Sequence, residues 1–301
     1  MWQGTDLAPG GAAPQGRRRS HRHGNRWSTL LLFVLAFLVS GCASSVASPG
    51  TPPAADAPRE LIVFAAASLT DAMTDLERTF EAAHPGVDVL MNFGGSSRLA
   101  TQLQEGAPAD VFAAANEAQM ANVVDAGLVD GSPRLFASNR LVIITPAANP
   151  AGIEEMADLA RPGVSLILAV PGVPIRDYSD QIIAGMSTPD GLGADFGDGV
   201  YANLVSEEDN VRQVVAKVAL GEADAGMVYT SDVTPDVADD LLTVAIPDDV
   251  NVVATYPIAP LTGGHAPDLG AAFVDLVLSE KGRAVLVKWG FGPVDATTVG
   301  E

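Results

Sequence analysis

Cysteine and histidine are scarce in this chain. Cys42 is the only cysteine among 301 residues, and only His84 and His265 lie beyond residue 58. One thiol cannot form an internal disulfide, and the sequence has no Cys/His spacing typical of a metal centre. It also lacks a Gly-x-Ser-x-Gly nucleophile elbow and a phosphate-binding Gly-x-x-x-x-Gly-Lys-Ser/Thr loop. The acidic residues show no spacing that indicates a catalytic pair. We therefore expect no enzymatic activity, no cofactor and no protein-bound metal cation.

Basic residues are also few. The chain has 17 basic and 37 acidic residues, and five of the basic but only one of the acidic residues precede Cys42. The remainder carries 12 basic and 36 acidic residues, a net charge of −24 with histidine neutral. Such a surface repels phosphate backbones, which argues against a nucleic-acid partner. If the ligand is an anion, the site must attract it locally, against the field of the whole protein.

The N-terminal apolar run is too short for a membrane span. Leu30–Val39 follows a basic region, Arg17–Arg26, as in a signal peptide. The run ends in Val-Ser-Gly-Cys at 39–42, which resembles the lipobox of bacterial lipoproteins. This resemblance implies a signal peptide over 1–41, a lipid on Cys42, and anchoring to the extracytoplasmic face of a bacterial membrane. The alternative is that Cys42 is an incidental thiol.

A tether and a folded body follow. Residues 42–58 contain Ser, Ala and Pro without periodicity and predict a flexible tether. From Arg59 onward strands and helices alternate, which predicts an α/β fold with mostly parallel sheets flanked by helices. About 240 folded residues suit two lobes, and 188–199 reads as a polar loop with at most one helical turn. Strands are expected at 61–64, 87–93, 110–114, 141–145, 165–170, 225–229, 241–246 and 252–259. Helices are expected from 69, 96, 174 and 210, after the third strand, and twice at the end of the chain.

Several helices begin with a hydroxyl or a free amide directly after a strand. Ser68, Ser96 and Val211 stand at such junctions, and Val173–Arg176 forms a fourth. If the junctions converge, they offer only hydrogen-bond donors, which suits a fully deprotonated oxyanion. Taken by itself, each junction is better explained by ordinary helix capping.

A set of motifs resembles the molybdate-binding proteins of ABC transporters. The stretch FAAASLTDA at 64–72 is similar to the family's opening signature, and FGGSSRLA at 93–100 with QEGAPADVF at 104–112 to the next. NRLVI at 139–143, EDNVR at 208–212 and GMVYTSD at 226–232 match later segments. The motifs follow in order, and the resemblance covers about residues 60 to 292.

The resemblance implies a two-lobed type II periplasmic-binding-protein fold with the ligand between the lobes. Lobe 1 would comprise 59–139 and 262–301, and lobe 2 140–261. The implied function is capture of molybdate, and of tungstate, without a cofactor, followed by delivery to an ABC permease by a monomer anchored through Cys42. The alternatives are a binding protein for another tetrahedral oxyanion such as sulfate, or a lipid-anchored sensor of the same fold.

The resemblance also implies a ligand set. Ser68 and Ser96 would each give a hydroxyl and an amide, Ile175 and Val211 an amide, and Tyr229 its phenol. Without the family, Tyr229 would be taken for a half-buried core residue. The family commonly has smaller residues at the positions of Ile175 and Arg176. Arg176 either contacts the anion or pairs with Asp177 or Asp180 on its own helix, and we favour the ion pair.

Overall fold

The computed structural model describes residues 58–294, which belong to one compact unit, Ala55–Glu301. The predicted signal peptide, Cys42 and nearly all of the predicted tether lie outside the described residues. The strands are β1 (Arg59–Ala66), β2 (Val87–Gly94), β3 (Val111–Ala113), β4 (Arg134–Pro146), β5 (Leu166–Ala169), β6 (Leu204–Glu208), β7 (Ala225–Tyr229), β8 (Leu241–Ala245) and β9 (Val253–Pro260). The α-helices are α1 (Thr70–Ala83), α2 (Ser96–Gln104), α3 (Glu117–Asp125), α4 (Pro174–Met186), α5 (Phe196–Ala202), α6 (Val211–Ala219), α7 (Pro267–Leu278) and α8 (Glu280–Lys288). Short 3-10 turns are η1 (Ala67–Leu69), η2 (Met156–Ala160), η3 (Thr230–Asp232) and η4 (Ala238–Asp240).

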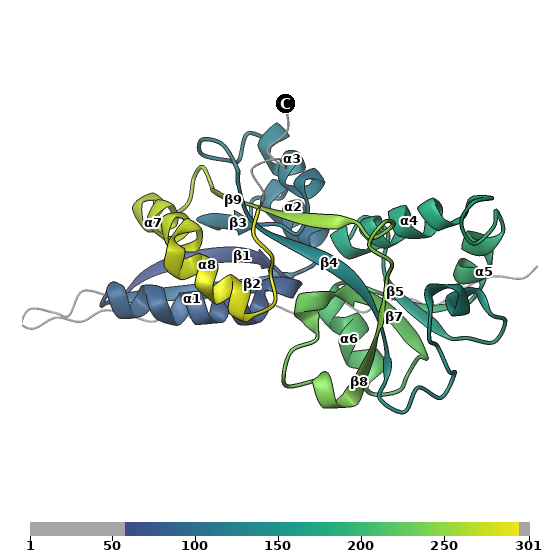
Figure 1. Cartoon of the computed structure of the whole chain (residues 1–301). Helices are drawn as coiled ribbons and strands as arrows, with labels where there is room; N and C mark the ends of the chain where they lie inside the picture. Colours follow the sequence, from purple (N-terminus) through teal and green to yellow (C-terminus); the bar gives the residue numbers. More distant parts are fainter. Residues whose placement is uncertain (1–57, 295–301) are drawn as a thin grey trace, which may run out of the picture. The chain divides into compact units, whose positions relative to one another are not determined.

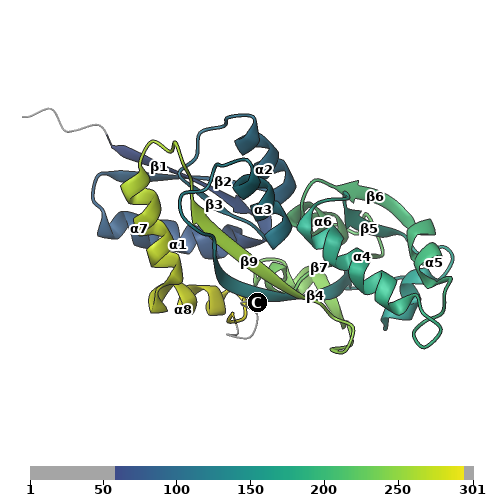
Figure 2. The same ribbon diagram turned by 90° about the horizontal axis from the view of Figure 1, so that it is seen from above.

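The first sheet has the strand order β2-β1-β3-β9-β4 (Figure 1). β1 runs parallel to β2 and β3, whereas β9 is antiparallel to both β3 and β4. Side chains alternate across β1: Leu61 and Val63 join the core that contains α1 and α7, and Phe64 joins the cluster of α2 and α3. Helices therefore cover both faces of this sheet, as Figure 2 shows from above.

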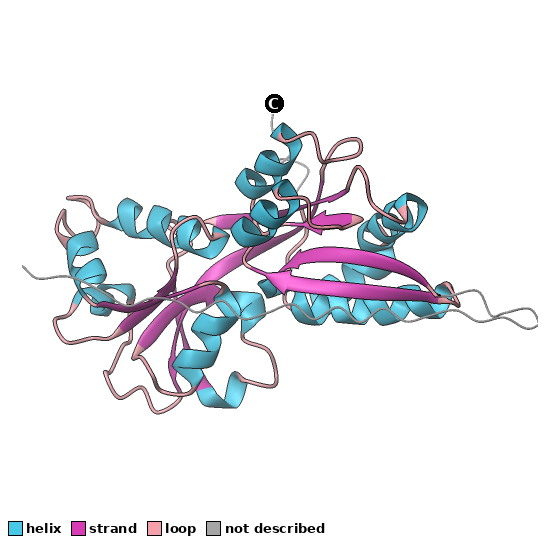
Figure 3. Cartoon of the chain, turned by 180° about the vertical axis from the view of Figure 1, so that it is seen from behind, coloured by secondary structure: helices cyan, strands magenta, loops and turns pink. Residues whose placement is uncertain are grey.

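The second sheet is reached through β4. Residues 134–140 of β4 pair with β9, and residues 141–146 pair with β7 and β8. Beyond β7 the order continues with the parallel strands β5 and β6. α4 and α6 pack against this sheet, and Figure 3 shows helices flanking the strands from behind. The predicted α/β class with helix-flanked sheets is confirmed. The sheets are mixed rather than mostly parallel: four strand pairings are parallel, and four, β3 with β9 and β4 with β7, β8 and β9, are antiparallel.

Some elements differ from the predicted ones. The first half of β4 and all of β6 were not predicted. β6 is an edge strand of sequence LVSEE, whose polar residues hide its strand character. The predicted loop at 188–199 ends in α5, which begins at Phe196. β9, which the sequence analysis assigned to lobe 2, pairs in the first sheet with β3.

Within residues 58–294, none of the helices has the length and apolar character needed to span a membrane.

Candidate anion-binding site

Strand register brings the helix starts together in pairs. The last residue of β1, Ala66, pairs with the last residue of β2, Gly94, so η1 and α2 begin at the same edge of the first sheet. In the second sheet, Ala169 at the end of β5 pairs with Glu208 at the end of β6, so α4 and α6 also begin side by side. This edge of an open α/β sheet is where ligands bind.

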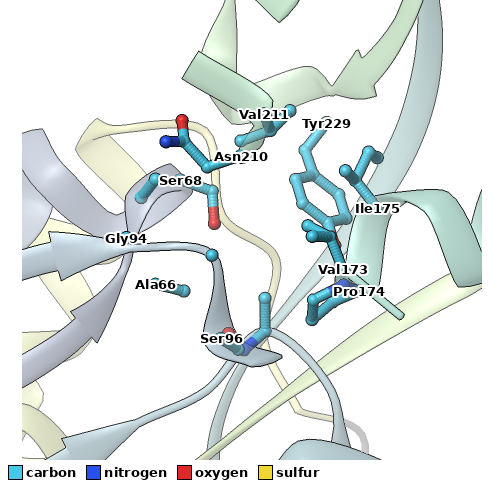
Figure 4. A pocket seen from close by; sticks show the side chains of 13 residues that line it. Ala66, Ser68, Gly94, Ser96, Val173, Pro174, Ile175, Asn210, Val211 and Tyr229 are labelled. Carbon is cyan, nitrogen blue, oxygen red and sulfur yellow. The ribbon is translucent and has the colours of Figure 1, made fainter. Parts of the chain in front are cut away.

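One cavity is lined from both sheets. Its empty volume is about 200 Å³, including the part open to solvent. All five residues of the predicted ligand set line it (Figure 4). No Lys, Arg, His, Asp or Glu is among the lining residues, and small or apolar side chains make up most of the wall. The lining residues are Ala66, Ala67, Ser68, Gly94, Gly95, Ser96, Ala115, Val173, Pro174, Ile175, Asn210, Val211 and Tyr229.

Neither serine in the cavity caps a helix with its side chain. η1, α1 and α2 all begin without a side-chain cap hydrogen bond, so the capping explanation is wrong for both serines. Ser96 Oγ instead accepts the amide N–H of Ala115 at 3.0 Å. Ser68 Oγ lies 3.2 Å from Tyr256 Oη. Both serines are buried, and Figure 4 shows the Ser68 hydroxyl directed toward the middle of the cavity.

Val211 and Ile175 bring main-chain amides. Val211 is the first residue of α6, and Ile175 is the second residue of α4 after Pro174. Amides in the first turn of a helix have no acceptor within the helix. The side chain of Asn210 caps α6 through the amide of Gln213 at 3.2 Å, which leaves the amide of Val211 available. The bulk of the Ile175 side chain does not remove it from the cavity wall.

Tyr229 ends β7 and is 1% exposed, so it is fully buried rather than half-buried. Within the described residues, its buried hydroxyl has no hydrogen-bond partner. An unpaired buried hydroxyl is costly, and an acceptor atom of a ligand in the cavity would satisfy it. Burial raises the pKa of Tyr229 well above 10, so the phenol keeps its proton and can donate it.

Arg176 lies outside the cavity wall. Its Nε donates to Asp180 at 2.7 Å, and its Nη1 donates to Glu207 and to the carbonyl of Ala169. The favoured ion pair is confirmed with Asp180 and not with Asp177. Asp177 instead accepts from the side-chain amide of Asn116 at 3.3 Å.

The sequence did not predict the ion pairs and close contacts around the cavity. Arg212 pairs with Asp71 of α1 at 2.5 Å and with the buried Asp232 at 3.0 Å. Burial raises the pKa of Asp232 to about 6, although Arg212 opposes the shift. Gly95 approaches the second sheet so closely that a Cβ there would lie 2.4 Å from the carbonyl oxygen of Asp209. Arg212 lies in a motif noted from the sequence, but its partners come from distant segments.

No group of three or more His, Cys, Asp or Glu side chains in the described part of the chain is arranged to hold a metal ion.

The sequence profile of the family described as bacterial extracellular solute-binding protein matches residues 61–292. The chain belongs to this family. It is 42% identical over 272 residues to the molybdate-binding protein ModA of Mycobacterium tuberculosis, which covers 88% of this chain and 98% of the relative. The resemblance found in the motifs is thereby confirmed.

Two solved structures share the fold. The periplasmic molybdate-binding protein of Azotobacter vinelandii superposes with a TM-score of 0.66 at 20% identity, covering 78% of this chain and 100% of the other. The sulfate-binding protein SubI of Mycobacterium tuberculosis superposes with a TM-score of 0.71 at 20% identity, covering 79% and 88%. At this level of identity the likeness supports the type II periplasmic-binding-protein fold alone.

Proposed function

We propose that this protein captures molybdate outside the cytoplasm and delivers it to an ABC permease. The observation that carries the proposal is the composition of the cavity: hydroxyls and helix-start amides from both sheets line it, and no ionisable side chain other than the phenol of Tyr229 does. The 42% identity to a protein named for molybdate binding supports this choice of anion. Ser68, Ser96, Ile175, Val211 and Tyr229 are the proposed ligands.

Neutral donors hold a dianion because their dipoles are fixed before it arrives. Free amides at helix starts carry partial positive charge, and the hydroxyls of Ser68 and Ser96 add further donors. An oxyanion without protons accepts all of these hydrogen bonds. A protonated phosphate would bring an O–H into a wall of donors and leave it unpaired. Sulfate would be disfavoured by its smaller size. These two effects give the proposed selectivity.

Closure of two lobes would couple binding to delivery. Contacts already join elements of the two sheets beside the cavity: Arg212 pairs with Asp71, and the side chain of Gln119 donates to the carbonyl of Gly172 at 3.0 Å. A ligand held by donors from both sheets favours the conformation in which they are close. We propose that a monomer with lobes 59–139 plus 262–301 and 140–261 docks on the permease in this closed form.

Tungstate binding, membrane anchoring and the absence of catalysis complete the proposal. Tungstate is a tetrahedral dianion like molybdate, so the same donors suit it. A lipid on Cys42 would hold the protein at the membrane through the 42–58 tether, and Cys42→Ser should move the protein from the membrane fraction into the medium. The family binds solutes, and we propose that the chain catalyses no reaction and needs no cofactor.

Thermal unfolding of residues 56–301 with molybdate, tungstate, sulfate and phosphate tests the proposal. A ligand at 100 times its Kd adds about 2.7 kcal/mol, which is roughly 5–10 °C for a body of this size. We expect this shift with molybdate and tungstate and almost none with phosphate. A shift with sulfate alone would indicate a sulfate-binding protein, and no shift with either molybdate or tungstate would refute the proposal.

A further inference from the structure

The direction of one hydrogen bond decides what Ser68 can offer the cavity. Its hydroxyl lies 3.2 Å from the hydroxyl of Tyr256, and by distance either oxygen could donate. If Ser68 donates to Tyr256, its only proton is used inside the protein. If Tyr256 donates to Ser68, the proton of Ser68 is free for a ligand. Tyr256 does not line the cavity, so its effect on a ligand would be indirect.

The orientation of a neighbouring amide is fixed by its surroundings. Asn139 Oδ1 lies 3.0 Å from the backbone N–H of Arg140, a group that can only donate. Oδ1 also accepts the hydroxyl of Thr230 at 2.8 Å. The other end of the amide must therefore be the NH₂ group, which donates to Ser231 Oγ at 2.7 Å and to Tyr256 Oη at 3.5 Å.

Tyr256 thus accepts a hydrogen bond from Asn139, and of these two hydrogen-bond partners only Ser68 can accept one from the Tyr256 hydroxyl. Tyr256 is fully buried, and burial raises its pKa well above 10, so it keeps that proton at neutral pH. Ser68 then stands at the end of a chain of donors, with its single proton free for the cavity. A hydroxyl that accepts one hydrogen bond is polarised into a better donor.

We propose that Tyr256, oriented by Asn139, is a positioning residue that makes Ser68 a hydrogen-bond donor to the bound oxyanion. The main chain orients Ser96 in the same way, because the oxygen of Ser96 accepts the N–H of Ala115 at 3.0 Å. The backbone thus orients the hydroxyl of Ser96, and the side-chain relay of Asn139 and Tyr256 orients the hydroxyl of Ser68. This inference rests on the proposed function, since it assigns a role in binding molybdate.

Calorimetric titration of Tyr256→Phe with molybdate tests the relay. The substitution removes one oxygen and keeps the ring that packs edge-on against Phe136, Tyr229 and Phe291, so the fold should persist. We expect the Kd to rise about three- to tenfold. In a Ser68→Ala chain the same substitution should change the Kd less than twofold, because no hydroxyl remains to be oriented. In a Ser96→Ala chain, Tyr256→Phe should still raise the Kd about three- to tenfold.

Tyr178→Phe is the matched control. Tyr178 is also buried and edge-on to Tyr229, at 6.4 Å compared with 5.8 Å for Tyr256, but its hydroxyl faces the amide of Thr255 and not Ser68. We expect loss of the Tyr178 hydroxyl to change the Kd for molybdate less than twofold in the unaltered, Ser68→Ala and Ser96→Ala chains. Equal effects of Tyr256→Phe in the Ser68→Ala and Ser96→Ala chains would overturn the relay while leaving molybdate binding intact. Failure of the unaltered protein to bind molybdate would overturn both proposals.

Discussion

Ile175 and Arg176 are neighbours on α4, yet they belong to regions of opposite character. Ile175 lines the cavity, where the wall consists of small, apolar and neutral polar residues. Arg176 lies outside the wall and is paired with Asp180 and Glu207. Arg212 repeats this arrangement: it follows the cavity residue Val211 and pairs with two aspartates.

The difference shows how a strongly acidic protein can bind an anion without a cation in its site. Each arginine next to the cavity is held by two carboxylates and presents no free positive charge to it, so the attraction for an anion comes from amides and hydroxyls whose positions the fold fixes. Arginine side chains would attract many anions, protonated or not. Fixed neutral donors select for the shape and the protonation state of the ligand. The predictions below separate these two modes of recognition.

The largest effect on affinity is expected from removing the hydroxyls of Ser68 and Ser96 together. In Ser68→Ala/Ser96→Ala, the Kd for molybdate should rise by well over tenfold, because each hydrogen bond to an anion contributes about 1.5–3 kcal/mol. The melting temperature without ligand should fall only modestly, since neither hydroxyl caps a helix and the main cost is the buried N–H of Ala115, which loses Ser96 Oγ as its acceptor. A large loss of stability without ligand would show that the serines serve the fold instead.

The next largest effect is expected from Gly95→Ala, which should raise the Kd for molybdate about tenfold. The added Cβ would lie 2.4 Å from the carbonyl oxygen of Asp209, which belongs to the other side of the cavity. Separation of the two sides relieves this clash, so ligand binding should suffer more than stability. The control is Gly185→Ala, where no atom lies within 4 Å of the added carbon; calorimetry should show an unchanged Kd. Equal affinities of the two variants would contradict the close approach.

Replacing Arg176 should affect stability more than binding. In Arg176→Met the Kd should change less than threefold, because the guanidinium does not line the cavity. The free energy of unfolding in urea should fall by about 1–2 kcal/mol, less than for a fully buried pair, because both carboxylates are partly solvated. Arg78→Met removes an exposed pair with Asp75 and should change neither quantity. A tenfold rise in the Kd of Arg176→Met would show that the guanidinium of Arg176 takes part in binding.

The smallest effect is expected from pH. Between pH 7 and pH 9 the Kd should vary less than twofold, because Tyr229, the one ionisable side chain in the wall, has a pKa well above 10. Asp232, with a pKa of about 6, stays ionised over this range. Titrations in matched buffers measure the dependence. A steady loss of affinity toward pH 9 would indicate that a cationic side chain binds the anion and loses its proton in this range.

Local features of the sequence predicted much of the site. Ser68, Ser96 and Val211 follow strands directly, and a strand-to-helix junction already places an amide at the carboxyl edge of a sheet. Tyr229 needed the family resemblance, because a tyrosine at the end of an apolar strand is typical of a core.

What the sequence did not predict depends on distant segments. Tyr256 and Ser68 are 188 residues apart, and the pairing of β9 with β3 and β4 brings Tyr256 to the site. Arg212 and Asp71 are 141 residues apart. The first half of β4 was missed because its strand character comes from pairing with β9, and its own residues alternate poorly. Long-range register, rather than propensity, sets these contacts.

A crystal structure of residues 56–301 grown with molybdate would test binding by neutral donors most directly, since molybdenum can be located by its anomalous scattering. We expect one molybdate in the cavity, within hydrogen-bonding distance of the hydroxyls of Ser68, Ser96 and Tyr229 and of the amides of Ile175 and Val211. No lysine, arginine or histidine should touch it. Molybdate bound elsewhere, or held by Arg176 or Arg212, would contradict recognition by neutral donors.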